Sequence, residues 1–307
     1  MTNAGSGARK CATQVWKGNP IASKMWRRRA AAAMVAATTM LLATWITLGP
    51  VSWDCYGTEA GSEIFQGVTY GCRQLNPTQE GRGAIHWVRI DLTAPGIELY
   101  TTPLDATAIA RGWQYRLRRI KDVLSQQKLA VAINGTLFTS DSNRVMRMSG
   151  DFARGVETIV ANYVVSHVSE HTYLLWFDDA LVPHLRRAKP PTAAELAAAK
   201  WGIGGQGVWL WEGQVWPGSD RSPDSRTAVA IDAPNKLLYL AIGQRISPRL
   251  LLEILANLGA KDGMLLDGGG SSSMAIGESA KGITAGRYGG WRPVATQFGV
   301  RAFPLRQ

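Results

Sequence analysis

A run of glycines and serines follows a single acid near the C-terminal end of the chain. Residues 263–266 are glycine or apolar, Asp267 comes next, and Gly268, Gly269, Gly270, Ser271 and Ser272 follow. Glycine adopts positive φ without strain, so three in a row allow successive N–H groups to point into one concavity that binds an oxyanion. The serine hydroxyls add donors. This pattern indicates chemistry on an anionic substrate, and the alternative is a glycine-rich turn after a buried strand.

Two arginines and an asparagine also stand at positions suited to substrate contact. Arg226 precedes an apolar stretch of strand length, and Arg292 lies in the short motif Trp291-Arg292-Pro293-Val294. The planar guanidinium group offers a fork of donors that matches phosphate. Asn134 follows an apolar strand and carries an amide suited to bonding a substrate hydroxyl. The alternatives are arginines at the surface and an ordinary Asn-Gly turn.

Tryptophans gather around these motifs. Trp209 and Trp211 share one face of the strand that follows a second glycine cluster, residues 203–207, while Trp216 and Trp291 lie near other motifs. The flat face of an indole is a good platform for a sugar ring. Tryptophans in strands are more often part of the core. Both interpretations stay open.

Several common catalytic arrangements are not visible in the sequence. His167 and His171 are four residues apart, but the segment around them is predicted as β-structure and lacks the H-E-x-x-H pattern of a zinc-binding helix. The loop 268–273 contains no lysine, so it does not match a nucleotide-binding P-loop. No Ser-His-Asp arrangement is apparent.

The positive charge of the chain is concentrated at its N-terminus. The formal net charge is +11 over 307 residues, and seven lysines and arginines precede the first acid, Asp54. The rest of the chain therefore carries little excess charge. Because nucleic-acid binding needs a basic surface, we expect no nucleic-acid partner.

The N-terminal segment has the pattern of a membrane anchor. Residues 1–29 form a basic tail, and residues 30–50 are uncharged and mostly apolar, long enough to span a bilayer of about 30 Å. Basic residues before the span and acids after it predict a cytoplasmic N-terminus and a periplasmic or extracellular remainder, in a single-pass inner or plasma membrane protein. The long basic leader favours an uncleaved signal anchor, and the alternative is secretion after signal cleavage.

The three cysteines divide between two compartments. Cys11 lies in the predicted cytoplasmic tail, whereas Cys55 and Cys72 lie beyond the predicted anchor, close together in sequence. Oxidising compartments favour a disulfide between Cys55 and Cys72, and the alternative is two free thiols. Residues 51–82 are rich in Gly, Thr, Glu, Asn and Pro, and they are predicted as a stalk.

Residues 83–307 are predicted as one domain of α+β or mixed α/β class, with a mixed β-sheet and flanking helices. Residues 84–92 and 97–101 are expected to pair as a hairpin across the turn at 94–96. Further strands are expected at 128–133, 152–168, 172–177, 208–211, 228–232, 237–242 and 264–266. Helices are expected at 120–127, 193–200 and 249–258.

Taken together, residues 83–303 resemble the phosphodiester glycosidase family. The segment 265–274 is similar to the Asp-Gly-Gly-Gly-Ser signature of that family, and the stretch 226–232 resembles its strand that opens with Arg-Thr or Arg-Pro. The order of the second glycine cluster, Arg226, the helix, Asp267 and Arg292 also fits. Two loops depart from the pattern: Thr136 and Leu137 stand where the family usually has glycine and phenylalanine, and Thr296 stands where it often has asparagine.

The resemblance implies a site with residues in named roles. Asp267, Arg226 and Asn134 are the expected catalytic residues, and Arg292 is an expected substrate ligand. The remaining expected substrate-binding residues are Gly205, Gly268, Gly269, Gly270, Ser271 and Ser272. No cofactor is expected to be required, although a divalent cation such as calcium, held partly by Asp267, is a minor hypothesis.

The function expected from these residues is hydrolysis of a sugar-1-phosphodiester, or a related bond, in an extracytoplasmic glycan that is anionic or phosphorylated. One alternative is a glycoside hydrolase or lyase that acts on exopolysaccharide without a phosphodiester. The other is an inert glycan-binding module tethered to the bilayer through residues 30–50, and Thr136 and Thr296 favour it. The oligomeric state and the identity of the sugar are not predicted.

Overall fold

The computed structural model describes residues 51–305, apart from 54, 56, 79, 142–146, 171–172, 188, 217–221 and 281–285. The predicted cytoplasmic tail, residues 1–29, and the predicted anchor, residues 30–50, lie outside this part of the chain. No helix within it is long and apolar enough to cross a membrane. Membrane attachment through residues 30–50 therefore stays a prediction.

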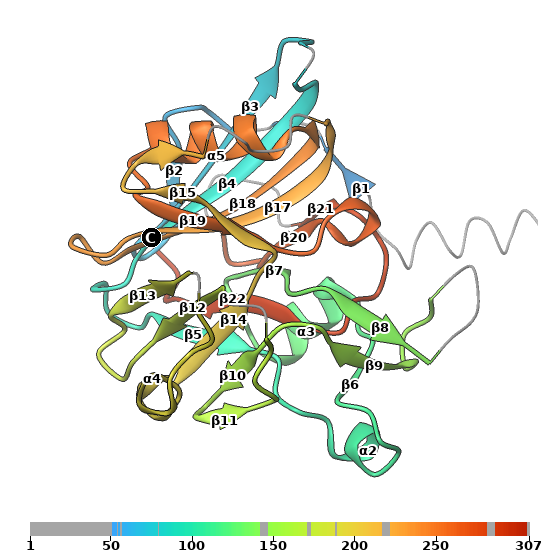
Figure 1. The fold of residues 1–307 in the computed structure, drawn as a ribbon. Coiled ribbons are helices and arrows are strands. Elements are labelled where there is room, and N and C mark those ends of the chain that lie inside the picture. The colour runs from blue at the N-terminus through green and yellow to red at the C-terminus, as the bar shows by residue number, and fades with distance from the viewer. Residues whose placement is uncertain are drawn as a thin grey trace, which may run out of the picture. The chain divides into compact units, whose positions relative to one another are not determined.

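Two large β-sheets form the centre of the domain (Figure 1). The first has eight strands in the order β16-β15-β19-β17-β18-β4-β3-β2, all paired antiparallel where they meet. Its strands are β16 (Gln214–Val215), β15 (Gly207–Trp211), β19 (Asp262–Leu265), β17 (Asp224–Asp232), β18 (Leu237–Ile246), β4 (Gly83–Asp91), β3 (Val68–Leu75) and β2 (Ser62–Phe65).

The second large sheet has six strands in the order β1-β21-β20-β7-β22-β5. Only the β1–β21 pair within it is parallel. Its strands are β1 (Val51–Ser52), β21 (Gly286–Gly289), β20 (Ser273–Ile276), β7 (Val131–Asn134), β22 (Gln297–Arg301) and β5 (Glu98–Thr101).

Alternating side chains explain why the two sheets stack. Val229 and Ile231 of β17 pack in one cluster with Val131 and Ile133 of β7, between the two sheets. Their neighbours on β17, residues 228 and 230, belong to a second cluster on the far face. Successive side chains of a strand point to opposite faces, so a strand buried on both faces reads as a continuous apolar run.

A helix covers the outer face of each sheet. The helix α5 (Pro248–Asn257) places Leu251, Leu252 and Leu255 against the eight-stranded sheet. Ser247 caps its N-terminus by accepting a hydrogen bond from the Leu250 N–H at 3.0 Å. The helix α3 (Ile120–Gln126) packs on the six-stranded sheet through a cluster that includes Val123 and Ala132. The layers are thus helix, sheet, sheet and helix.

Two smaller sheets accompany the large ones; all of their strands lie between β7 and β15 in the chain except β6, which precedes β7. The five-stranded sheet β11-β10-β14-β12-β13 contains Val164–Val165, Ile159–Ala161, Trp201–Gly204, Leu174–Phe177 and Pro183–Arg186. The three-stranded sheet β6-β9-β8 contains Tyr115–Arg116, Phe152–Gly155 and Phe138–Ser140. Short helices α2 (Ala106–Ile109) and α4 (Ala193–Ala198) complete the described elements. The domain is therefore mostly β-structure with few helices.

This architecture corrects three sequence predictions. The expected single mixed sheet with flanking helices is in fact a pair of nearly all-antiparallel sheets. The expected hairpin between 84–92 and 97–101 does not form, because β4 belongs to one large sheet and β5 to the other. The expected stalk at 51–82 is wrong for residues 62–75, which form β2 and β3. Period-two burial of Val68, Tyr70 and Cys72 explains that pairing.

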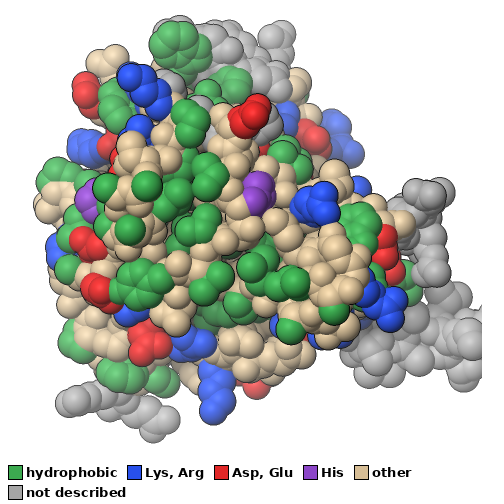
Figure 2. All heavy atoms as spheres, turned by 60° about the horizontal axis from the view of Figure 1, so that its bottom comes forward, with side chains coloured by type: hydrophobic (Ala, Val, Ile, Leu, Met, Phe, Trp, Pro, Cys, Tyr) green, Lys and Arg blue, Asp and Glu red, His purple; other side chains and the backbone are tan. Residues whose placement is uncertain are grey.

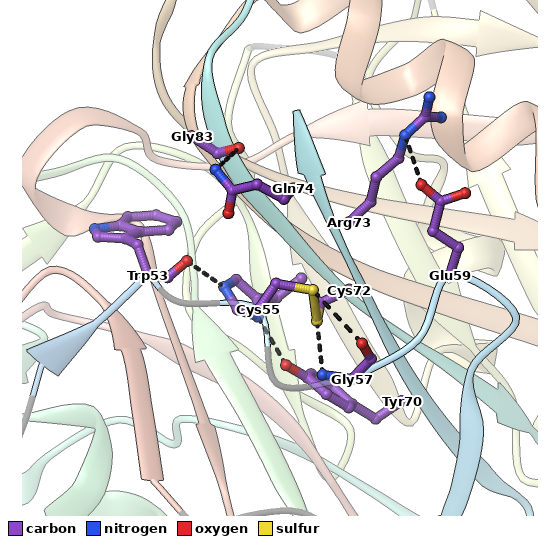
Figure 3. The surroundings of a disulfide bond; sticks show 10 residues. Trp53, Cys55, Gly57, Glu59, Tyr70, Cys72, Arg73, Gln74 and Gly83 are labelled. Atoms are coloured by element: carbon purple, nitrogen blue, oxygen red, sulfur yellow. Dashed lines mark hydrogen bonds and ion pairs between the residues drawn. A yellow bond between two sulfur atoms is a disulfide. The ribbon is translucent and has the colours of Figure 1, made fainter. Parts of the chain in front are cut away.

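The N-terminal part of the domain is joined to the eight-stranded sheet by the expected disulfide, between Cys55 and Cys72 of β3 (Figure 3). The Gly57 N–H donates to the Cys72 sulfur at 3.0 Å. Nearby, the Tyr70 hydroxyl and the buried His86 ring share a hydrogen bond of 2.8 Å. The segment before β2 is thus held against the sheet.

Charged side chains are spread over the surface. The face drawn in Figure 2 carries basic and acidic side chains interspersed among apolar and neutral ones. A nucleic-acid backbone is bound by a stripe of one charge.

Candidate active site

The site lies where β19 ends between β15 and β17. Leu265 of β19 pairs with Ala228 of β17, and the Leu266 N–H donates to the Thr227 carbonyl at 2.9 Å. Asp267 therefore lies beside the start of the apolar part of β17, close to Arg226, which precedes Thr227. Asp267 is 7% exposed. The antiparallel register of β19 and β17 thus brings the predicted acid and the predicted arginine to the same sheet edge.

Asn134 joins the two sheets at this edge. Its Nδ2 donates to the Asp267 carbonyl at 2.7 Å, and its Oδ1 accepts from the Thr227 hydroxyl at 2.8 Å and from the Ser273 N–H at 3.0 Å. The side chain is fully buried. Its amide is already engaged by protein groups, so the geometry gives Asn134 a positioning role rather than the expected direct contact with substrate.

The glycine loop turns directly after Asp267. Gly269 has φ of +59° and begins a 3-10 turn, Gly269–Ser271. The N–H groups of Ser271 and Ser272 donate to the Gly268 and Gly269 carbonyls at 3.2 Å and close this turn. The N–H groups that open a helical turn have no partner within it. Gly270 is exposed, so the loop presents backbone to solvent at this point.

The two predicted arginines flank the glycine loop. A Cβ placed on Gly268 would lie 3.9 Å from Nη1 of Arg226, and one placed on Gly270 would lie 3.9 Å from Nη1 of Arg292. Arg226 is also tied to the chain before it, since its Nη2 donates to the Ser222 carbonyl at 3.1 Å. The structure thus brings one guanidinium group to each end of the loop.

A third arginine, Arg147, approaches from the loop that precedes β9. Its guanidinium carbon lies 4.7 Å from the centre of the Phe138 ring, and that of Arg292 lies 5.4 Å from the same ring. Phe138 therefore supports two cations on one aromatic ring, an arrangement that holds guanidinium groups without neutralising them. The sequence analysis did not single out Arg147, because no motif surrounds it.

Charge and burial perturb the titration of these groups. Burial raises the pKa of the Asp267 carboxyl, whereas the Ser271 hydroxyl, the charge of Arg292, the Gly268 N–H and the charge of Arg147 act in the opposite direction. Burial lowers the pKa of Arg292, repulsion by Arg147 adds to this, and Asp267 opposes it. A carboxyl with a raised pKa is suited to proton transfer near neutral pH.

The predicted serines lie beneath the loop. Ser271 is 1% exposed and Ser272 is fully buried. The Ser272 hydroxyl and the Thr136 hydroxyl have no hydrogen-bond partner within the described residues. Ser272 thus lies inside the protein, contrary to the expectation of direct substrate contact, and the buried Ser271 hydroxyl likewise has no hydrogen-bond partner within the described residues.

Gly205 has a packing role. A Cβ at this position would lie 2.5 Å from the Leu265 carbonyl oxygen and 2.8 Å from the Met264 sulfur. Only glycine allows β14 to approach β19 this closely. The neighbouring Gln206 donates from its Nε2 to the Leu266 carbonyl at 2.8 Å, one residue before Asp267. Gly205 is therefore near the site but buried, and Gln206, which sequence analysis did not select, is the exposed residue there.

The two family departures contact each other. The Gly135 N–H donates to the Thr296 carbonyl at 2.8 Å, and the Thr136 N–H donates to the Thr296 hydroxyl at 3.1 Å. Both threonines are buried. Their contact closes the loop after β7. In that loop the Gly135 carbonyl accepts a hydrogen bond from the Asp267 N–H at 3.1 Å.

Histidines and acids do not gather into a metal site in the described part of the chain. No group of three or more His, Cys, Asp or Glu residues suited to a metal ion is present there. His167 contacts the Val156 carbonyl through Nε2 at 3.1 Å and Gln114 through Nδ1 at 3.2 Å. His171 lies outside the described residues. The buried acid Glu157, missed by sequence analysis, accepts from the Ser169 hydroxyl at 3.2 Å.

The family model described as phosphodiester glycosidase matches residues 127–301, more than half of the chain. The protein therefore belongs to the phosphodiester glycosidase family. No curated protein matches the chain at a significant level.

Solved structures share the fold at low sequence identity. The catalytic domain of zebrafish N-acetylglucosamine-1-phosphodiester alpha-N-acetylglucosaminidase, auto-inhibited by its pro-peptide, matches with a TM-score of 0.56 and 12% identity over 81% of this chain and 87% of that chain. A hypothetical protein from Synechocystis has a TM-score of 0.50 and 15% identity, covering 76% and 62%. A putative exported protein from Burkholderia pseudomallei has a TM-score of 0.51 and 12% identity, covering 71% and 74%.

Proposed function

We propose that this protein is a glycosidase that hydrolyses a sugar-1-phosphodiester in an extracytoplasmic glycan. The observation that carries the proposal is a single buried carboxylate, Asp267, followed by a glycine loop with a guanidinium group at each end. Membership of the phosphodiester glycosidase family supports the same chemistry. The Cys55–Cys72 disulfide supports an oxidising compartment, because structural disulfides are rare in the cytosol.

The phosphate of the substrate is assigned to the glycine loop. Arg226 and Arg292 would each donate to its oxygens from opposite ends, and the exposed backbone at Gly269 and Gly270 would add N–H donors. Arg147 adds positive charge on the Arg292 side. These groups neutralise the phosphate before reaction and stabilise the second negative charge that it gains when it leaves.

Asp267 is assigned to the sugar side of the scissile bond. In the proposed reaction a water attacks the anomeric carbon, the bond from that carbon to the phosphate oxygen breaks, and its electron pair leaves with the phosphate monoester. The water proton passes to Asp267 if it acts as general base, and otherwise its charge stabilises the oxocarbenium-like sugar. Both roles require the ionised carboxylate. A phosphate monoester is a good leaving group and needs less acid assistance than an alcohol.

Arginine, rather than a divalent cation, is assigned the task of balancing the charge of Asp267 and the phosphate. Calcium prefers a shell of six to eight oxygen ligands, whereas the charges that surround Asp267 are guanidinium groups. This donor set repels a metal ion. Turnover is therefore expected to be unchanged after treatment with a chelator, and restoration of lost activity by added calcium would contradict this assignment.

N-acetylglucosamine is the first sugar to test. The zebrafish structure of the same fold is of an enzyme named for N-acetylglucosamine-1-phosphodiester. The assay follows release of the phosphate monoester from a methyl diester of N-acetylglucosamine 1-phosphate, with methyl N-acetylglucosaminide as the plain glycoside. Turnover of the diester alone is the expected result. Turnover of the glycoside alone would replace the proposal by a glycoside hydrolase without a phosphodiester.

Replacement of Asp267 by asparagine gives the sharpest test of the site. The neutral amide neither accepts the water proton nor stabilises the sugar cation, so the rate is expected to fall by about 10³-fold while folding is retained. The matched control is Asp122→Asn, the same chemical change on the exposed face of α3. Unchanged activity in the Asp267→Asn protein would reject the assigned role. Glycan binding with no turnover by the unaltered protein would instead favour an inert binding module.

A further inference from the structure

A surface groove lined by aromatic side chains begins beside the proposed active site. Two cavities of about 440 Å³ each adjoin here and share Arg187 in their walls. One cavity contains Gln206, Trp209 and Trp216, and the other contains Trp211. We call the combined lining of these two cavities the aromatic groove. Besides Leu185, Arg186, Glu195 and Val208, it contains Tyr173, Trp176, His184, Arg187, Gln206, Gly207, Trp209, Trp211 and Trp216.

The aromatic groove is built by the backbone rather than by loose surface residues. The pairing of β15 with β19 shifts register between Val208 and Leu210, a β-bulge. Bulges re-aim side chains next to functional sites. Trp209 packs with the cluster beneath α5, whereas Trp211 lies under Arg187, whose guanidinium carbon is 4.1 Å from the centre of the ring. The expectation that both tryptophans share one face is therefore wrong, and each lines its own cavity.

Gly207 and Trp216 fix the positions of two indoles in the groove. The Trp209 indole lies so close over Gly207 that any Cβ there would overlap its Nε1. Glycine is thus required for the indole to lie across the strand. Trp216 is held by a hydrogen bond from its N–H to the Trp209 carbonyl at 2.7 Å, yet its side chain is 63% exposed. Trp209, Trp211 and Trp216 lie close together along the chain, and gathered apolar side chains at a surface mark ligand-binding grooves.

The groove reaches the active site through Gln206. This exposed side chain lines the cavity with Trp209 and Trp216, and its Nε2 donates to the carbonyl of Leu266, the residue before Asp267. A molecule that lies in the groove therefore ends next to the proposed reacting centre.

We propose that the aromatic groove binds the linear oligosaccharide that extends from the scissile phosphodiester. A sugar ring has an apolar C–H face that packs on an indole and hydroxyls that need fixed donors and acceptors. The groove supplies both, with indoles at Trp209 and Trp216 and polar groups at Gln206 and Arg187. The proposal rests on the proposed function for its direction along the substrate.

Binding tests the groove without any turnover. The full chain is titrated with short linear oligosaccharides of glucose, mannose and N-acetylglucosamine, and binding is followed by calorimetry and by tryptophan fluorescence. At least one oligosaccharide is expected to bind, and Trp216→Ala is expected to weaken it by about tenfold, as for an anchor residue. The control is Phe303→Ala, which removes an aromatic ring that is 54% exposed elsewhere. Equal affinities in all three proteins, or no binding to any oligosaccharide, would overturn the proposal.

Kinetics then separate the groove from the active site. Two substrates are compared, the methyl diester of N-acetylglucosamine 1-phosphate and the diester in which a linear mannose trisaccharide replaces methyl. Trp216→Ala is expected to raise KM about tenfold for the trisaccharide diester and to leave the methyl diester unchanged. An equal effect on both substrates would overturn the groove. If neither diester is turned over while an oligosaccharide binds in a Trp216-dependent way, the proposed reaction fails and the groove stands.

Discussion

The two ends of the six-stranded sheet differ. One end borders a surface cavity, and the other borders the candidate active site. At one end β7 and β20 finish in a cavity of about 400 Å³ whose lining includes Lys121, Lys128 and Glu278. These charged side chains are exposed. At the other end, Asn134 of β7 donates to the carbonyl of the buried Asp267 and accepts from the Ser273 N–H of β20. The first end has a cavity with exposed charged side chains. At the second end the acid is buried and its backbone is fixed by a hydrogen bond.

The comparison teaches that positioning distinguishes the candidate active site. The lysine end offers flexible side chains in water, where each charge is worth little. At the aspartate end the acid is buried, the amide that fixes its backbone has its hydrogen bonds satisfied, and Arg226 and Arg292 are placed by strand register and loop closure. Electrostatic interactions are stronger in such a buried site, and its groups need not rearrange during the reaction.

After Asp267→Asn, the largest expected effect on turnover comes from the arginines of the glycine loop. Arg226→Lys and Arg292→Lys each keep the charge and remove the planar fork, so kcat/KM for the sugar-1-phosphodiester is expected to fall about 100-fold. The matched control is Arg89→Lys, on an exposed position of β4, which is expected to leave the rate unchanged. Full activity in both arginine variants would contradict the assignment of the substrate phosphate to the aspartate end of the sheet.

The next effect concerns the amide that joins the two sheets. Asn134→Ala leaves the Thr227 hydroxyl, the Ser273 N–H and the Asp267 carbonyl without that partner, so the free energy of unfolding is expected to fall by about 2–4 kcal/mol. Denaturant unfolding measures this. Asn235→Ala removes a hydrogen bond at an exposed turn, to Asp232, and is expected to cost less than about 1 kcal/mol. Equal losses would show that Asn134 does not have a special role.

A smaller effect is expected from pH, with opposite signs for activity and stability. Burial raises the folded pKa of Asp267 above its unfolded value. Activity needs the carboxylate and is therefore lost as pH falls through the folded pKa. Between the two pKa values the folded state binds more protons, so its stability decreases as pH rises and recovers as pH falls. In Asp267→Asn the contribution of this group to pH-dependent stability should vanish, and thermal unfolding at several pH values against the unaltered protein checks this.

The smallest expected effect is at the opposite end of the sheet. The double replacement Lys121→Ala and Lys128→Ala removes two exposed charges from the cavity there. Neither KM nor kcat for the phosphodiester is expected to change by more than about twofold, because exposed charges contribute little. A large rise in KM would mean that the substrate is bound at the lysine end, and the assignment of the site would have to be revised.

Local patterns accounted for the elements but not for their partners. The stretch 226–232 was predicted as a strand and forms part of β17, and residues 249–258 were predicted as a helix and correspond to α5 within a residue. The prediction of a hairpin between 84–92 and 97–101 was wrong, because nothing in the sequence of either strand specifies which sheet it joins. The prediction of a stalk was wrong for β3, because the Gly, Thr and Glu content of the segment was given more weight than the alternation of Val68, Tyr70 and Cys72.

The site shows the same division. A motif marked Asp267 with its glycines, and two short motifs marked Arg226 and Arg292. Arg147 stands in no motif, and its proximity to Arg292 at the Phe138 ring arises only from tertiary contacts. Ser272 and Gly205 were expected at the substrate because they lie in motifs, yet both are buried where the chain packs on itself.

The sequence by itself determined the acid, the glycines after it, the flanking arginines and most of the strands, because each of these depends on residue type and spacing over a few positions. The tertiary structure alone decided that Asn134 fixes the Asp267 backbone, that Arg147 joins the cations, and that a bulge turns Trp209 and Trp211 apart. Those facts depend on contacts between residues far apart in the chain. Strand register sets such contacts, and register is a property of the whole sheet.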